Sequence, residues 1–87
     1  MIQKLEKESI INALKEIDKS GIPKNRSSKK FHLKYSGKLY PPKYVISIAN
    51  KIQFGTELEP NCFSGGKEAN NFLKNLNFEI VEGNKKI

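Results

Sequence analysis

The sequence predicts one small α+β domain with the element order α-β-β-α-α-β, in which helices cover one face of a small antiparallel sheet. Three observations support this fold class. Apolar residues recur at helical spacing in three segments, and a further segment alternates around a serine-glycine pair. The length of 87 residues suffices for one compact core and not for two. We assign residues 1–82 to this single domain and residues 83–87 to a flexible C-terminal tail.

The first helix is predicted from apolar side chains that recur every three or four residues between Ile10 and Ile17. It is expected to run from about residue 4 to 19. Gly21 follows at the place where helices commonly end with a left-handed residue. Residues 20–30 are polar and basic and lack any periodicity, so we expect a loop there.

A β-hairpin is predicted over residues 31–40, because apolar and polar residues alternate there around the serine-glycine pair. A two-residue loop would place Leu39 beside Lys34 on the polar face of the hairpin. A three-residue loop, with Gly37 at positive φ, would place Leu39 with Tyr35 on the apolar face. We favour the three-residue loop.

The second half of the chain predicts two helices and a strand. Pro42 suits the first position of a helix over about residues 42–53, since proline loses no hydrogen bond there. Ser64 is the expected N-cap of the third helix, and Asn77 sets its end. The alternating residues 78–81 form the expected last strand.

The charge distribution predicts an anionic partner. The formal net charge is +7 and the sequence pI is about 9.6. Residues 19–56 hold nine Lys or Arg and no Asp or Glu, whereas the segments on either side are each close to neutral. Tyrosines and a histidine are interleaved with these cations, and nucleic-acid surfaces combine cations with planar groups. A solvated, functionless lysine face is the plainer interpretation of the same tract.

Residues for catalysis are scarce. The chain has one histidine, His32, and one cysteine, Cys62, so neither an intramolecular disulfide nor a CxxC zinc or redox site is possible. The sequence predicts a non-catalytic protein without metal or cofactor. It shows no signal peptide and no apolar segment long enough to span a membrane, so we expect a cytoplasmic protein.

A second anion site is suggested before the third helix. Ser64, Gly65 and Gly66 would leave backbone N–H groups open to a phosphate at the helix start. Lys67 at that start opposes the helix macrodipole, a cost that a bound phosphate would offset. A simple tight turn capped by Ser64 explains the same residues.

Four blocks of sequence carry a family resemblance. They are GKLYPPKYVISIA at residues 37–49, FSGG at 63–66, NNFL at 70–73 and FEI at 78–80. Together they resemble the N-terminal head modules of McrA-like, modification-dependent HNH restriction endonucleases and related restriction proteins. The resemblance covers about residues 10–81, and the first block is its most specific part.

The resemblance implies a DNA-binding specificity module of a restriction system that reads modified, methylated cytosine in double-stranded DNA. An HNH or other nuclease domain would belong to a larger protein, since one histidine is too few for that metal site. A basic protein-interaction adaptor and an RNA-binding domain are the alternatives. The DNA contacts that the resemblance implies are Arg26, Ser27, Lys38, Tyr40, Lys43, Ser64, Gly65 and Gly66, with Tyr40 as the reader of the methyl group. The charge pattern adds Lys29, Lys30 and Lys67.

Overall fold

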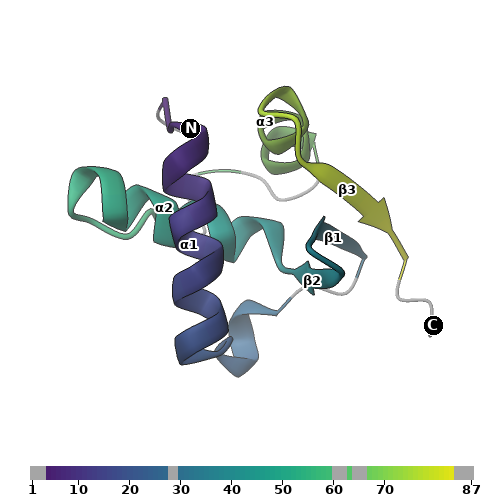
Figure 1. The fold of residues 1–87 in the computed structure, drawn as a ribbon, viewed down its shortest axis with the longest axis horizontal. Coiled ribbons are helices and arrows are strands. Elements are labelled where there is room, and N and C mark those ends of the chain that lie inside the picture. Colours follow the sequence, from purple (N-terminus) through teal and green to yellow (C-terminus); the bar gives the residue numbers. More distant parts are fainter. Residues whose placement is uncertain (1–3, 28–29, 60–62, 64–66, 84–87) are drawn as a thin grey trace.

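The computed structural model describes residues 4–27, 30–59, 63 and 67–83, and its element order is the predicted α-β-β-α-α-β (Figure 1). A single turn of 3₁₀ helix, η1, lies in the segment that was expected to be a loop. The elements are α1 (Lys7–Ser20), η1 (Lys24–Arg26), β1 (Phe31–Tyr35), β2 (Lys38–Tyr40), α2 (Pro42–Phe54), α3 (Lys67–Asn75) and β3 (Glu79–Glu82).

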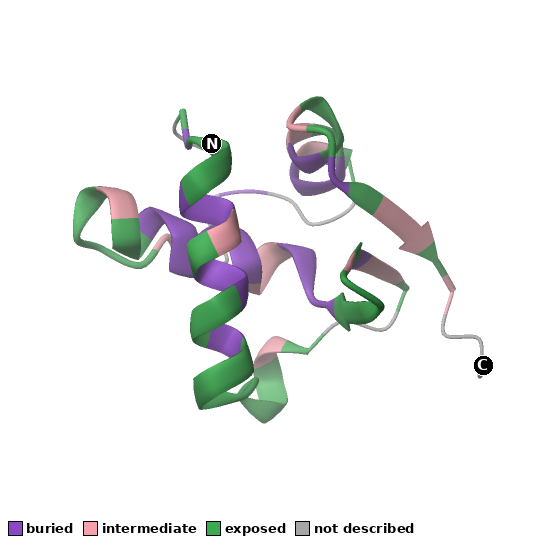
Figure 2. Cartoon of the chain, viewed as in Figure 1, coloured by how far each residue is buried: buried purple, intermediate pink, exposed green. Residues whose placement is uncertain are grey.

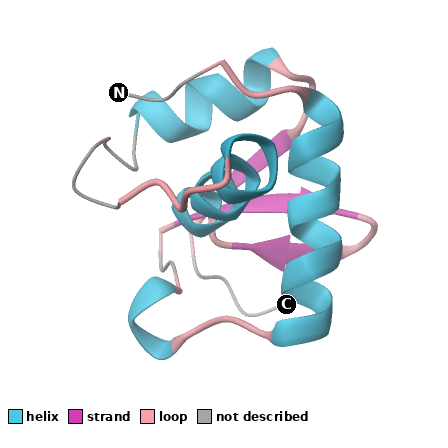
Figure 3. Cartoon of the chain, turned by 90° about the vertical axis from the view of Figure 1, so that its left-hand side faces the viewer, coloured by secondary structure: helices cyan, strands magenta, loops and turns pink. Residues whose placement is uncertain are grey.

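The three strands form one antiparallel sheet in the order β2-β1-β3, so β1 is central. The helix α2 packs on β1, α3 packs on β3, and α1 packs on α2. Figure 3 shows the strands behind the helices in that view. The α+β class and the helix-covered sheet are therefore confirmed.

The hydrophobic core lies between α1, α2 and the inner face of the sheet. Ile10, Leu14, Leu33, Ile46 and Leu73 are its largest side chains with almost no exposed surface. In Figure 2 the buried residues of α1 and α2 lie where the two helices cross. The apolar spacing from Ile10 to Ile17 predicted the α1 part of this core, whereas α2 is buried continuously from Val45 to Asn50, so its buried surface is wider than one stripe.

The hairpin turn has two residues, so the favoured three-residue loop was wrong. Tyr35 lies directly opposite Lys38, and Ser36 and Gly37 between them both have positive φ, at 52° and 78°. Two consecutive left-handed residues match the strand twist better than a type I or II turn. In this register Leu39 faces the same side as Lys34 and is 46% exposed.

The start of α1 is capped by a side chain from α2, which the sequence did not predict. Gln53 Oε1 accepts hydrogen bonds from the Glu6 N–H (2.9 Å) and the Ser9 hydroxyl (2.8 Å). Its Nε2 donates to the Lys4 carbonyl at 3.1 Å. The helix begins at Lys7 instead of near residue 4, at the position where this amide satisfies an otherwise unpaired N–H.

A residue at positive φ follows each α-helix, but Gly21 after α1, with φ 86° and ψ −179°, is not in the left-handed helical conformation expected there. Gly55 closes α2 with φ 89°. Asn77 adopts φ 70° after α3, and the Phe78 N–H then donates to the Leu73 carbonyl at 3.1 Å. The strand β3 begins at Glu79, one residue later than predicted. The expected N-cap of α3, Ser64, lies outside the described residues.

Candidate nucleic-acid interface

The sheet has one face turned away from the helices. The cross-strand register places Lys34 of β1 opposite both Leu39 of β2 and Glu79 of β3, and all three are exposed. His32 and Val81, which form the next pair on the same face, are half-buried. We call these five residues the outer sheet face. It combines one cation, one imidazole and two aliphatic side chains with one carboxylate, Glu79, which lies opposite Lys34.

Five exposed lysines lie around this face and the neighbouring end of α1. They come from the end of α1, from η1, from the residue before β1 and from the hairpin; in Figure 1 the end of α1 lies at the bottom and the hairpin lies higher and to the right. We call them the basic surface; its members are Lys19, Lys24, Lys30, Lys34 and Lys38. A polyanion that contacted the hairpin would also be attracted by the lysines at the end of α1.

Asp18 joins the hairpin to the end of α1. Its Oδ1 lies 3.5 Å from Lys38 Nζ and accepts a hydrogen bond from the Tyr40 hydroxyl at 2.9 Å. The Lys38 side chain is nevertheless 63% exposed, so this surface pair leaves the ammonium open to a phosphate. Lys38 therefore belongs to the basic surface, with its charge partly compensated by Asp18.

Tyr40 is in the core, not on the surface. It lies opposite Leu33 on the inner side of the sheet and is 3% exposed. Burial, followed by the hydrogen bond to Asp18, raises the pKa of Tyr40 to about 12. A ring in this position presents no face to a duplex, so the predicted role of Tyr40 as reader of a methyl group was wrong.

Arg26 also turns inward. Its Nη2 donates to the hydroxyl of the buried Ser47 at 2.9 Å, and its Nη1 lies 3.5 Å from a Glu57 carboxylate oxygen. The guanidinium covers the Tyr44 ring, 4.9 Å from its centroid. Ser47 in turn donates to the Leu58 carbonyl at 2.6 Å. These contacts fix η1 to α2, so Arg26 stabilises the fold more directly than it could bind a phosphate.

The remaining predicted contacts are scattered. Ser27 is exposed and donates to the Lys24 carbonyl at 3.3 Å. Lys43 is half-buried, 5.0 Å from the Phe63 ring centroid, and Lys67 is exposed on α3. Of the predicted residues, Lys30 and Lys38 belong to the basic surface. Lys29, Cys62, Ser64, Gly65 and Gly66 lie outside the described residues.

Three lysines of the basic surface were missed as individual contacts. Lys19, Lys24 and Lys34 belonged to the acid-free tract but carried no motif that would single them out. For Lys34, the alternation of β1 was the available signal, because a polar residue between Leu33 and Tyr35 must lie on the outer face.

The family is shown by a match over nearly the whole chain. Residues 3–82 match the model of the ScoMcrA-like, N-terminal head domain, and the chain belongs to this family. Membership indicates a DNA-recognition module of restriction proteins, which agrees with the basic surface described above. No curated protein and no solved structure gives a significant match to the chain.

Among the described residues, no helix combines the length and apolarity that crossing a membrane requires. Within the same part of the chain, no three His, Cys, Asp or Glu side chains group as metal ligands.

Proposed function

We propose that this chain is a reader of modified cytosine in double-stranded DNA, with no nuclease activity of its own. Membership of the head-domain family supports a role in DNA recognition within a larger restriction protein that carries the nuclease. The observation that carries the proposal for this chain is the basic surface. Its exposed lysines lie on the β1–β2 hairpin and on the segment from the end of α1 to the start of β1, where their charge can pair with DNA phosphates.

Duplex binding should depend steeply on salt. If the acid-free tract of residues 19–56 neutralises about four to six phosphates, the slope of log affinity against log salt is expected to be about −4 to −5. Fluorescence anisotropy with a labelled duplex at several salt concentrations measures it. A slope near zero would contradict DNA binding and favour the adaptor, which would bury apolar surface such as Ile22 and Phe54 instead.

The contribution of single lysines can be tested against a matched control. Lys34→Ala should weaken duplex binding and lower the salt slope by about one unit, because one phosphate contact is lost. Lys38→Ala should weaken it less, since Asp18 already offsets that charge. Lys74→Ala removes the same charge from α3 and should leave affinity nearly unchanged. Equal losses in Lys34→Ala and Lys74→Ala would show that only net charge matters.

Reading of the modification requires a separate comparison. Unmodified and 5-methylcytosine duplexes of the same sequence should be titrated at one salt concentration. Contact with a single methyl group is worth on the order of 0.8 kcal/mol, which predicts a preference of a few-fold for the methylated duplex. Equal affinities would leave a DNA-binding domain and remove the modified-base reader.

A further inference from the structure

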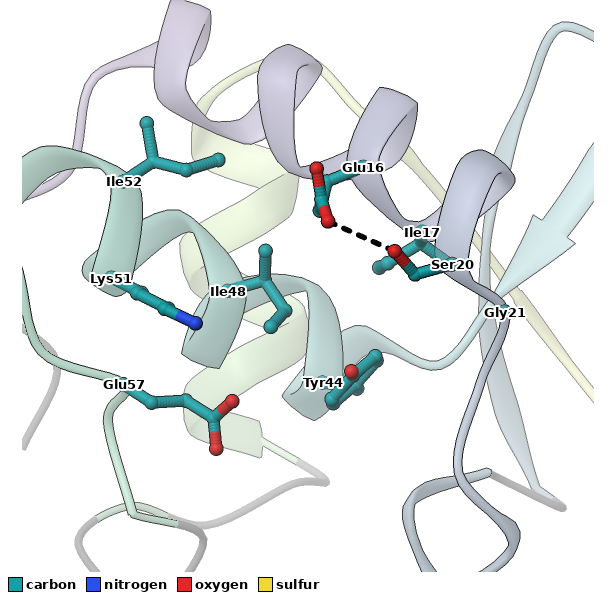
Figure 4. A pocket seen from close by; sticks show the side chains of 9 residues that line it. All are labelled: Glu16, Ile17, Ser20, Gly21, Tyr44, Ile48, Lys51, Ile52 and Glu57. Atoms are coloured by element: carbon teal, nitrogen blue, oxygen red, sulfur yellow. Dashed lines mark hydrogen bonds between the residues drawn. The ribbon is translucent and has the colours of Figure 1, made fainter.

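A cavity of about 550 Å³ opens between the C-terminal half of α1, α2 and the segment after α2 (Figure 4). Its walls come from Glu16 and Ser20 on one side and from Tyr44, Ile48 and Lys51 on the other. The cavity adjoins Gly21, which directly precedes the segment carrying η1. It therefore lies next to the end of the basic surface formed by Lys19 and Lys24.

The lining carries both hydrogen-bond donors and acceptors, and its charges are balanced. Glu16 accepts a hydrogen bond from the Ser20 hydroxyl at 2.9 Å, which leaves further lone pairs on its carboxylate. Glu57 pairs with Arg26, which lies outside the lining, at 3.5 Å, and Lys51 is the cation of the lining itself. Such a lining suits a neutral ligand with polar edges better than an isolated ion.

One wall of the cavity is aromatic and held in place. Tyr44 is half-buried, and Arg26 covers its ring at 4.9 Å while hydrogen-bonding to Ser47. Arg26 itself does not line the cavity. The ring is thus fixed from outside and remains available to a ligand inside, where an aromatic side chain can stack on the face of any base. Ile17 and Ile48 supply the apolar floor beside it.

We propose that this cavity receives a single nucleobase turned out of the DNA, and that it favours a base with an exocyclic amino group. Tyr44 would stack on the base, and Glu16 would accept from the amino group, as carboxylates do from cytosine N4. A methyl group on the base would lie against Ile17 or Ile48. The proposal rests on the proposed function, because DNA held on the basic surface delivers the base to the cavity.

The direct test uses nucleosides and the whole chain. In methyl NMR, 5-methyl-2′-deoxycytidine should shift the signals of Ile17 and Ile48 while leaving Ile46, in the core, unmoved. Thymidine, which lacks the amino group, should shift them less at the same concentration. Glu16→Gln should reduce the difference between the shifts that 5-methyl-2′-deoxycytidine and thymidine cause. Because Glu16 is exposed on α1, the variant keeps the fold. Unchanged Ile17 and Ile48 signals would overturn the proposal.

A duplex experiment separates this proposal from the proposed function. Turning out a base costs less when it is mismatched, so the parent protein should bind a duplex with a C·A mismatch several-fold more tightly than the paired duplex. Tyr44→Ala, checked for folding by circular dichroism, should lose that preference and keep the salt slope. Salt-dependent binding without any mismatch preference would retain DNA recognition and reject the base site. N-acetyl-arginine amide is the control for a protein ligand. If it shifts the methyl NMR signals of Ile17 and Ile48 and the nucleoside does not, the cavity is a protein-docking site and the base site is rejected.

Discussion

Replacing Ile46 by alanine is expected to lower the free energy of unfolding by about 2–5 kcal/mol, the range found for large-to-small changes in a core. Ile46 has no exposed surface and lies in α2, the helix that contacts α1, β1 and α3. A domain of this size has a total free energy of unfolding of roughly 5–15 kcal/mol, so the expected loss is a large share of that total. Urea unfolding followed by circular dichroism measures it.

Ile52→Ala is the matched control, because it removes the same atoms from the same helix at a position that is 43% exposed. Its loss should be well under half that of Ile46→Ala. Similar losses for the two variants would show that Ile46 is no more buried than Ile52 in the folded protein.

Alkaline pH is expected to destabilise the protein through Tyr40. The pKa of this hydroxyl is raised to about 12 in the folded state, above its ordinary value of 10. Below pH 10 the phenol is neutral in both the folded and the unfolded state, so its full contribution to the free energy of unfolding is present. Between pH 10 and 12 the unfolded chain releases the proton while the folded protein retains it, so stability falls by about 3 kcal/mol, at roughly 1.4 kcal/mol per pH unit.

Tyr40→Phe isolates this effect from the lysines that titrate in the same range. The variant should be less stable than the parent at pH 8, because it lacks the hydrogen bond to Asp18, a loss of about 1 kcal/mol. As pH rises above 10 the difference should shrink and then reverse. Parallel stability curves for the two proteins up to pH 12 would show that Tyr40 ionises freely in the folded state.

The hairpin shows how far sequence reasoning can go. Alternation over residues 31–40 predicted both strands, but a shift of one residue in the loop changes which side Leu39 faces. The turn depended on Ser36 adopting positive φ, which is uncommon for a residue other than glycine. The sequence alone therefore predicted the hairpin, whereas the choice of turn required the structure.

The candidate site was predicted as a region and not as a set of residues. The acid-free tract located the basic surface, because charge counts need no knowledge of the fold. They do not distinguish a cation at the surface from one turned inward. Arg26 binds Ser47 and Glu57, which are 21 and 31 residues away along the chain, so its role depends on tertiary contacts. The cavity beside Tyr44 depends on tertiary packing in the same way.

The glutamine that caps α1 has a consequence for how the protein is made. Gln53 is added 47 residues after Glu6, whose N–H it satisfies. At a synthesis rate of 5–20 residues per second, Gln53 is added roughly 2–10 seconds after Glu6. A lone 14-residue helix is marginal in water, so α1 stays largely unformed during that interval. The first helix of the chain is therefore completed only once the second has been synthesised.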